Sequence, residues 1–263
     1  MLVNLISRIG YRGIRNIISV GRMTLFFLSG VKNCFVYPFQ LPKILDHTWF
    51  IGAKSIVVII LTALFTGMVL GLQGYYSLVK VGSEAALGSV VALSLVRELG
   101  PVFTAIMITA RAGSAMAAEI GVMRISEQVD ALVTMDIHPV RFIFSPRIVA
   151  AVISFPLLTA LFDVIGIFGG YFTGSIMLGV EGGIYMDHVI SSVEIFDING
   201  GFIKAIVFSL VVTATCCYRG FYTHLQGHEA IGARGVSMST TNAVVQSCVL
   251  ILISDFIITY FLV

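Results

Sequence analysis

Two adjacent charged residues, Arg97 and Glu98, lie in the middle of a long apolar stretch. Twelve uncharged residues precede the pair and twelve follow it, from Ala85 to Ala110. A helix through this stretch would hold both charges near the centre of a bilayer, where each costs at least about 2.5–3.5 kcal/mol. Charges at that depth usually face a bundle interior or a wet cavity, so the pair is a candidate functional site. A buried structural ion pair is the alternative interpretation.

The pair needs partners from elsewhere in the chain. Neighbouring side chains on a helix diverge by about 100°, so Arg97 and Glu98 cannot simply neutralise each other. Three other ionisable residues interrupt long apolar runs, and these are Asp163, Lys204 and Asp255. Asp163 is either a hydrogen-bonded interior residue or part of a polar path, and the sequence assigns no partner to Asp255.

The apolar runs that surround these residues set the class of the protein. Hydrophobic residues make up 57% of the 263 positions and charged residues only 11%, less than half the charged share of a typical soluble domain. We therefore predict an all-α integral membrane protein with one membrane domain over residues 1–263. The predicted membrane spans are residues 53–79, 85–110, 148–178, 199–218 and 236–262.

Glycine and proline indicate how these spans are shaped. Gly67 and Gly71 are four residues apart, and so are Gly166 and Gly170, which predicts close approach of helices along these faces. Pro101 predicts a bend directly after the Arg97–Glu98 pair. Residues 181–197 read as an acidic connection between the third and fourth spans.

Basic residues predict the orientation in the membrane. Residues 1–54 contain seven Lys or Arg and one acidic residue, whereas the loop 181–197 contains no Lys or Arg. The N-terminus is therefore predicted to be cytoplasmic and, after five spans, the C-terminus periplasmic. Within residues 1–50, an interfacial amphipathic helix is predicted from basic residues on one helical face, namely Arg8, Arg12, Arg15 and Arg22.

The same orientation places residues 111–147 and 219–234 in the cytoplasm. The first of these segments is the longest polar one, and its apolar residues follow a helical spacing. They predict a short amphipathic helix that ends before Pro139 and suits docking of a partner; they are Ile120, Met123, Val129, Leu132 and Val133.

Catalytic and metal-binding motifs are absent from the sequence. It contains no G-x-x-x-x-G-K-[ST] phosphate loop, so the chain is not expected to hydrolyse nucleotide itself. His224 and His228 do not form H-E-x-x-H, and the four cysteines have no C-x-x-C spacing, which argues against a metal site. No basic patch supports nucleic-acid binding. We therefore expect no catalytic residue, cofactor or metal in this chain.

Several sequence blocks closely resemble the MlaE family, the permease subunits of ABC transporters that move phospholipids between bacterial membranes. The blocks are GMVLGLQGY (67–75), ALSLVRELGPV (92–102), ARAGSAMAAEIG (110–121), EQVDAL (127–132), and SPR with ISFPLLT (145–159). The resemblance implies a homodimer in the bacterial inner membrane that maintains outer-membrane lipid asymmetry. It also implies a cytoplasmic ABC ATPase that binds ATP and Mg²⁺, a STAS-domain protein and a periplasmic hexamer of MCE-domain subunits.

The resemblance also implies roles for particular residues. The lipid would occupy a cavity at the homodimer interface, whose matching positions here are Arg97, Glu98, Lys204, Leu72 and Tyr75. A coupling helix between the second and third spans would contact the ATPase, and its matching positions are Glu119, Gly121, Arg124, Glu127 and Leu132.

Two other functions remain open at this stage. One is a secondary transporter that relays protons through Glu98, Asp163 or Asp255, although no inverted repeat is evident. The other is a membrane scaffold that binds partner proteins without transporting lipid. Neither the direction of transport nor the preferred lipid head group follows from the sequence.

Overall fold

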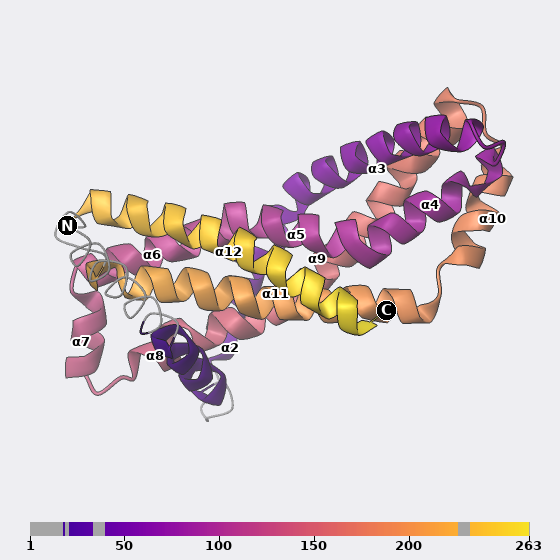
Figure 1. Ribbon diagram of the computed structural model, residues 1–263. Coiled ribbons are helices and arrows are strands. Elements are labelled where there is room, and N and C mark those ends of the chain that lie inside the picture. The colour runs from indigo at the N-terminus through magenta and orange to yellow at the C-terminus, as the bar shows by residue number, and fades with distance from the viewer. Residues whose placement is uncertain (1–17, 19–20, 34–39, 226–231, 263) are drawn as a thin grey trace, which may run out of the picture.

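The protein is a multi-pass bundle of long helices. The computed structural model describes residues 18, 21–33, 40–225 and 232–262, and every regular element in these residues is helical. Five segments are long and apolar enough to cross a membrane, which confirms the predicted class and number of spans. They are Leu41–Val79, Glu84–Ile125, Pro139–Met177, Ile195–Phe221 and Ala233–Leu262. Figure 1 shows them running lengthwise, with α7 and α10 at opposite ends.

The first and third of these segments pack backbone against backbone. The first comprises α2 (Leu41–Ile51), η1 (Ala53–Ser55) and α3 (Ile56–Val79). The third is mainly α9 (Ser145–Tyr171), which ends in a π-helical turn, η5 (Phe172–Met177). A Cβ atom added at Gly67 would overlap the carbonyl oxygen of Gly166, and one at Gly71 would lie 3.0 Å from that of Gly170. The predicted close approach along the glycine faces is confirmed.

The second segment is longer than predicted. Its elements are η2 (Glu84–Ala86), α4 (Leu87–Ser94), η3 (Leu95–Leu99), α5 (Gly100–Ile108), η4 (Thr109–Gly113) and α6 (Ser114–Ile125). The helix continues beyond Ala110, where the predicted membrane span ends. The helix continues because α6 packs against two other long helices, α11 (Ile195–Phe221) and α12 (Ala233–Leu262). Its small residue Ala117 is fully buried there.

The polar segment after α6 contains two short helices, α7 (Gln128–Thr134) and α8 (Pro139–Ile143). The single amphipathic helix predicted from Ile120 to Val133 is wrong, because α6 ends at Ile125 and a turn follows. Glu127 adopts a left-handed backbone conformation in this turn, with φ of 58°, which interrupts a right-handed helix.

The acidic connection is more structured than predicted. It contains α10 (Gly182–Ser192), and α11 already begins at Ile195. Glu194 and Asp197 form a capping box at the start of α11, in which each side chain accepts a hydrogen bond from the other residue's backbone. Asp197 therefore belongs to the first turn of a long helix rather than to a loop.

The described part of the N-terminal region packs onto the bundle. Residues 21–33 are helical, and Phe26 is buried with its ring centroid 4.6 Å from that of Phe144. The aromatic rings of Tyr218 and Phe221 on α11 complete this cluster. Of the four arginines that predict the amphipathic helix, Arg22 alone lies within the described residues. The amphipathic helix itself therefore stays a prediction. His228, which follows η6 (Thr223–Leu225) in the sequence, also lies outside the described residues.

Candidate functional site

Arg97 and Glu98 lie in η3, a π-helical turn within the second span. Such turns occur often at functional sites because they change the direction in which side chains leave the helix. Arg97 is directed to α11, where its Nε lies 2.7 Å from Oδ1 of Asp197. The Asp197 side chain is only 5% exposed, whereas that of Arg97 is 55% exposed. A buried carboxylate thus anchors an arginine whose outer part stays accessible.

Glu98 is paired through a buried lysine on α11. Nζ of Lys204 lies 2.5 Å from Oε2 of Glu98 and 3.1 Å from Oδ1 of Asp255 on α12. It also donates a hydrogen bond of 2.9 Å to the backbone carbonyl of Arg97. The Lys204 side chain is 2% exposed. Its contact with Asp255 is an ion pair only, because Oδ1 of Asp255 has no hydrogen-bond partner among the described residues.

We call Arg97, Glu98, Asp197, Lys204 and Asp255 the charge cluster. With two cations and three carboxylates its formal charge is −1 if all five are ionised. The cluster joins the second, fourth and fifth spans. A cavity of about 230 Å³ opens beside it, and its walls include Arg97, Glu98, Lys204 and Thr259. Thr259 also donates a hydrogen bond of 3.2 Å to Oε1 of Glu98.

The prediction that Arg97 and Glu98 take partners from other segments is confirmed, but sequence reasoning did not identify the partners. The sequence predicts Asp197 to lie in the acidic connection between the third and fourth spans. Its position three residues after Glu194, directly before an apolar run, is a helix-start signal that could have placed it in α11. No local pattern indicates that Lys204 and Asp255 meet.

The two other predicted lipid-site residues lie on α3 and are not part of the 230 Å³ cavity. Leu72 is 40% exposed, and Tyr75 is partly buried against the core with an edge-to-face contact to Tyr76. Within a single copy of the protein, Leu72 and Tyr75 therefore do not reach the charge cluster, and their role stays a prediction.

The three acidic residues of the proton-relay alternative do not form a continuous path. Glu98 and Asp255 share Lys204, whereas Asp163 lines a different cavity.

The predicted coupling residues lie at the opposite end of the bundle from α10, and two of them form ion pairs. Glu119 on α6 pairs with Arg147 on α9 at 2.9 Å, and the Arg147 side chain is only 4% exposed. Arg124 lies 2.7 Å from Asp130 on α7 and donates from Nε to Nδ1 of His224 at 3.1 Å.

The remaining three coupling residues differ in exposure. Gly121 is buried, and a Cβ atom there would lie 3.3 Å from Oγ1 of Thr223. Leu132 packs against the aromatic cluster around Phe26. Glu127 is exposed at the turn between α6 and α7. The contacts of Glu119, Gly121, Arg124 and Leu132 therefore hold α6 and α7 in position, whereas Glu127 stays accessible.

Acidification is expected to loosen the contact between α6 and η6. Nδ1 of His224 can accept from Arg124 only while it carries no proton, and partial burial together with the Arg124 charge lowers the pKa of His224 from its usual 6.5. The unfolded segment then binds more protons than the folded one, so stability from this contact is full above about pH 6.5 and falls below it. We expect the protection factors of the amides at residues 223–225, which are corrected for the intrinsic slowing of hydrogen exchange by acid, to fall below that pH. In His224→Phe this fall should disappear, and an unchanged pH response in that variant would contradict the assignment.

Comparison with known proteins adds an independent line of evidence. A family model described as Permease MlaE matches residues 44–261, which include the whole charge cluster. A probable ABC transporter permease protein of Rickettsia bellii is 39% identical over 259 residues, which is 98% of each chain. The intermembrane phospholipid transport system permease protein MlaE of Haemophilus influenzae is 40% identical over 260 residues, covering 98% of this chain and 97% of that one. The chloroplastic protein TRIGALACTOSYLDIACYLGLYCEROL 1 of Arabidopsis thaliana is 35% identical over 210 residues, covering 80% and 58% respectively.

Proposed function

The chain belongs to the MlaE permease family, and from that premise we propose that it is the membrane subunit of an ABC transporter for phospholipids. It moves phospholipid between the inner and outer membranes and so maintains the lipid asymmetry of the outer membrane. ATP is hydrolysed by a separate cytoplasmic ATPase, since this chain has no phosphate loop. A STAS-domain protein and a periplasmic hexamer of MCE-domain subunits complete the assembly.

The observation that carries this proposal is the charge cluster beside a cavity in the membrane-spanning part of the bundle. A phospholipid presents a phosphate and apolar tails, so its site needs a few polar groups set in an apolar wall. Lys204 is buried and is already paired within the protein with Glu98, Asp255 and the backbone carbonyl of Arg97. Arg97 is paired through Nε only in the described residues, and its side chain is more than half exposed. The terminal nitrogens of Arg97 therefore bind the phosphate, and Lys204 positions Glu98.

The rest of the lipid site requires a second copy of the chain. The 230 Å³ cavity is too small for a diacyl lipid, since sites for drug-sized molecules already reach about 300–1,000 Å³. In a homodimer, the cavities of both copies join into one lipid site at the interface. Leu72 and Tyr75 on α3 form the apolar wall of that larger site.

Energy from ATP reaches the site through α6 and α7. These helices face the cytoplasm, with the N-terminus of the chain on the same side and the C-terminus in the periplasm. The ATPase contacts Glu119, Gly121, Arg124, Glu127 and Leu132. Because α6 continues the same helix that carries η3, movement of α6 changes the position of Arg97 and Glu98. Lipid is released in the state that holds it less tightly.

Replacing Arg97 tests the proposal directly. In membrane vesicles that contain the full assembly, Arg97→Met is expected to lower ATP-dependent phospholipid transport by roughly tenfold or more, since a charge-assisted contact contributes about 1.5–3 kcal/mol. Arg97→Lys should retain part of the activity because it keeps a charge but lacks the planar fork of arginine. Lys80→Met, at an exposed position just after α3, is the matched control and should transport normally.

Three outcomes would contradict the proposal. Normal lipid transport by Arg97→Met would remove the phosphate role, and absence of any transport by the intact assembly would favour a scaffold. Transport that continues without ATP and stops when a protonophore is added would favour the proton-coupled alternative. Co-purification of the chain from cells that express its neighbouring genes, followed by mass spectrometry, identifies the partner proteins and the bound lipid.

A further inference from the structure

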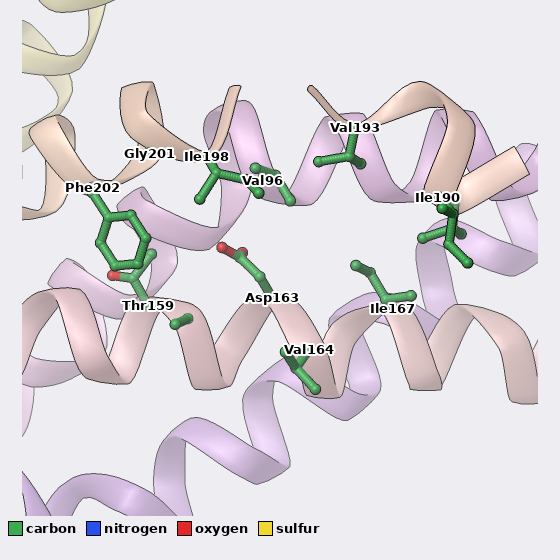
Figure 2. A pocket seen from close by; sticks show the side chains of 12 residues that line it. Val96, Thr159, Asp163, Val164, Ile167, Ile190, Val193, Ile198, Gly201 and Phe202 are labelled. Carbon is green, nitrogen blue, oxygen red and sulfur yellow. The ribbon is translucent and has the colours of Figure 1, made fainter. Parts of the chain in front are cut away.

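A second cavity lies next to η3. It has a volume of about 360 Å³, and residues of η3, α9, α10 and α11 line it (Figure 2). Gly201 lines both this cavity and the one beside the charge cluster. A Cβ atom at Gly201 would lie 2.8 Å from the carbonyl oxygen of Val96, so backbone alone separates the two cavities here. We call this second space the Asp163 cavity.

The walls of the Asp163 cavity are apolar except at two positions. Ten of its twelve lining residues carry no polar side-chain atom, and none of the twelve is Lys, Arg or His. The exceptions, Thr159 and Asp163, are four residues apart on α9, so they share one face of that helix. Figure 2 shows the Asp163 carboxylate directed from α9 into the space between that helix and Ile198.

Both polar side chains have an atom without a hydrogen-bond partner. Among the described residues, Oγ1 of Thr159 and Oδ1 of Asp163 are buried without a hydrogen-bond partner, and Thr159 is only 3% exposed. Oδ1 of Asp163 lies against Gly100, where an added Cβ atom would overlap it. Buried polar groups without partners destabilise a protein, and native structures contain few of them. Because Oδ1 is closed off by Gly100, Oδ2 is the carboxylate oxygen left for a partner from outside the chain in the cavity that Asp163 lines.

The chemistry of the walls defines that partner. An ionised carboxylate only accepts hydrogen bonds, whereas the threonine hydroxyl can donate or accept, so it is Asp163 that selects a partner with a donor. The apolar walls select a molecule that is otherwise hydrophobic, and the membrane surrounding the bundle is the source of such molecules. The volume of the cavity falls within the range of about 300–1,000 Å³ that is usual for small-molecule sites.

We propose that the Asp163 cavity binds a long-chain amphiphile from the bilayer whose polar end is a hydrogen-bond donor, either a hydroxyl or an amine. The donor binds Asp163 and Thr159, and the chain lies against Ile190, Val193 and Phe202. This site uses none of the charge-cluster side chains and does not depend on phospholipid transport. Because Val96 lines the cavity and directly precedes Arg97, a bound amphiphile would stabilise η3, the turn that carries Arg97 and Glu98.

The test measures binding to the purified full-length chain in detergent, without ATPase or transport. The probe is a long-chain primary amine that carries a photoreactive group in its chain, and labelled peptides are identified by mass spectrometry. Label is expected on α9, α10 and α11 around the Asp163 cavity. An unlabelled long-chain amine should compete, whereas a methyl ester of equal chain length, which only accepts hydrogen bonds, should not. Competition by a long-chain alcohol as well would show that a neutral hydroxyl suffices, and its absence would assign the site to amines.

Matched variants separate a binding role from a structural one. Asp163→Asn keeps the shape of the side chain and is expected to weaken amine binding by about tenfold, the change that accompanies loss of one charge-assisted contact. Thr159→Val should weaken it less. Thr215→Val is the control, since Oγ1 of Thr215 is also buried without a partner in the described residues but lies outside the cavity.

Thermal unfolding distinguishes this proposal from a folding defect. Asp163→Asn should unfold at or above the wild-type temperature, because it removes a buried charge without removing any described hydrogen bond. Unchanged amine binding in this variant, effective competition by the methyl ester, or label confined to other helices would each overturn the proposal. This test does not use transport by the Arg97→Met variant. The proposal for the Asp163 cavity and the proposal for phospholipid transport can therefore be contradicted separately.

Discussion

Replacing Lys204 by methionine is expected to destabilise the protein by about 3 kcal/mol and to abolish phospholipid transport. The substitution keeps the length of the side chain but leaves Glu98 and Asp255 facing each other without a cation. Removing one partner of a buried ion pair usually costs about 3–5 kcal/mol. We expect the lower end of that range because 41% of the Glu98 side chain is exposed and can be partly solvated.

The measurement is unfolding of the purified chain in a mild detergent, followed by helical circular dichroism over a denaturant series. The double variant Lys204→Met/Glu98→Gln should regain part of the lost stability, since it also removes one of the stranded carboxylates. Its transport should remain impaired, because Glu98 no longer carries its charge. Lys80→Met is the control for loss of a lysine. Wild-type stability in Lys204→Met would show that the charge cluster is not a structural unit.

Replacing Gly67 by alanine is expected to destabilise the protein by about 1–3 kcal/mol, the usual cost of overpacking. The added Cβ atom would overlap the backbone carbonyl of Gly166 on α9. A flexible side chain could rotate away from such an overlap, but a helix backbone cannot. The two helices must therefore separate, and the packing of α3 on α9 loosens along its length.

Gly183→Ala is the matched control, since a Cβ atom at that position in α10 has no neighbour within 4 Å. Alanine favours a helix over glycine by about 1 kcal/mol, so the control should unfold at or slightly above the wild-type denaturant concentration. Unfolding of Gly67→Ala at the same denaturant concentration as Gly183→Ala would indicate that α3 and α9 are not held this closely. Cross-linking between cysteines introduced on α3 and α9 gives a second measure of their separation.

Both predicted effects arise where the bundle has no room to adjust. At Gly67 the constraint is steric, because two helix backbones are in contact. At Lys204 it is electrostatic, because one cation is held between carboxylates from two different helices. Gly201 lies where the steric and the electrostatic constraint meet. Because it has no side chain, α11 packs closely against the backbone of Val96, directly beside the Arg97–Glu98 pair. This contact links the packing of the spans to the geometry of the proposed lipid site.

The sequence by itself determined the membrane class, the five spans and the need of Arg97 and Glu98 for partners from other segments. These conclusions depend on local quantities, namely the length of an apolar run and the cost of a charge within it, which need no knowledge of neighbouring segments. The glycine spacing likewise predicted where helices approach each other closely, because a missing side chain has the same effect on whichever helix packs there.

Only the tertiary structure decided which residues meet. Local spacing could not pair Arg97 with Asp197 or Lys204 with Asp255, since these contacts join different helices. The second span continues to Ile125 because α11 and α12 pack against it, which overrides the polar composition around Arg111. The Asp163 cavity is also a product of packing, since its walls come from four separate elements. A sequence records the charge of a buried side chain, but its partners depend on how the helices are arranged in space.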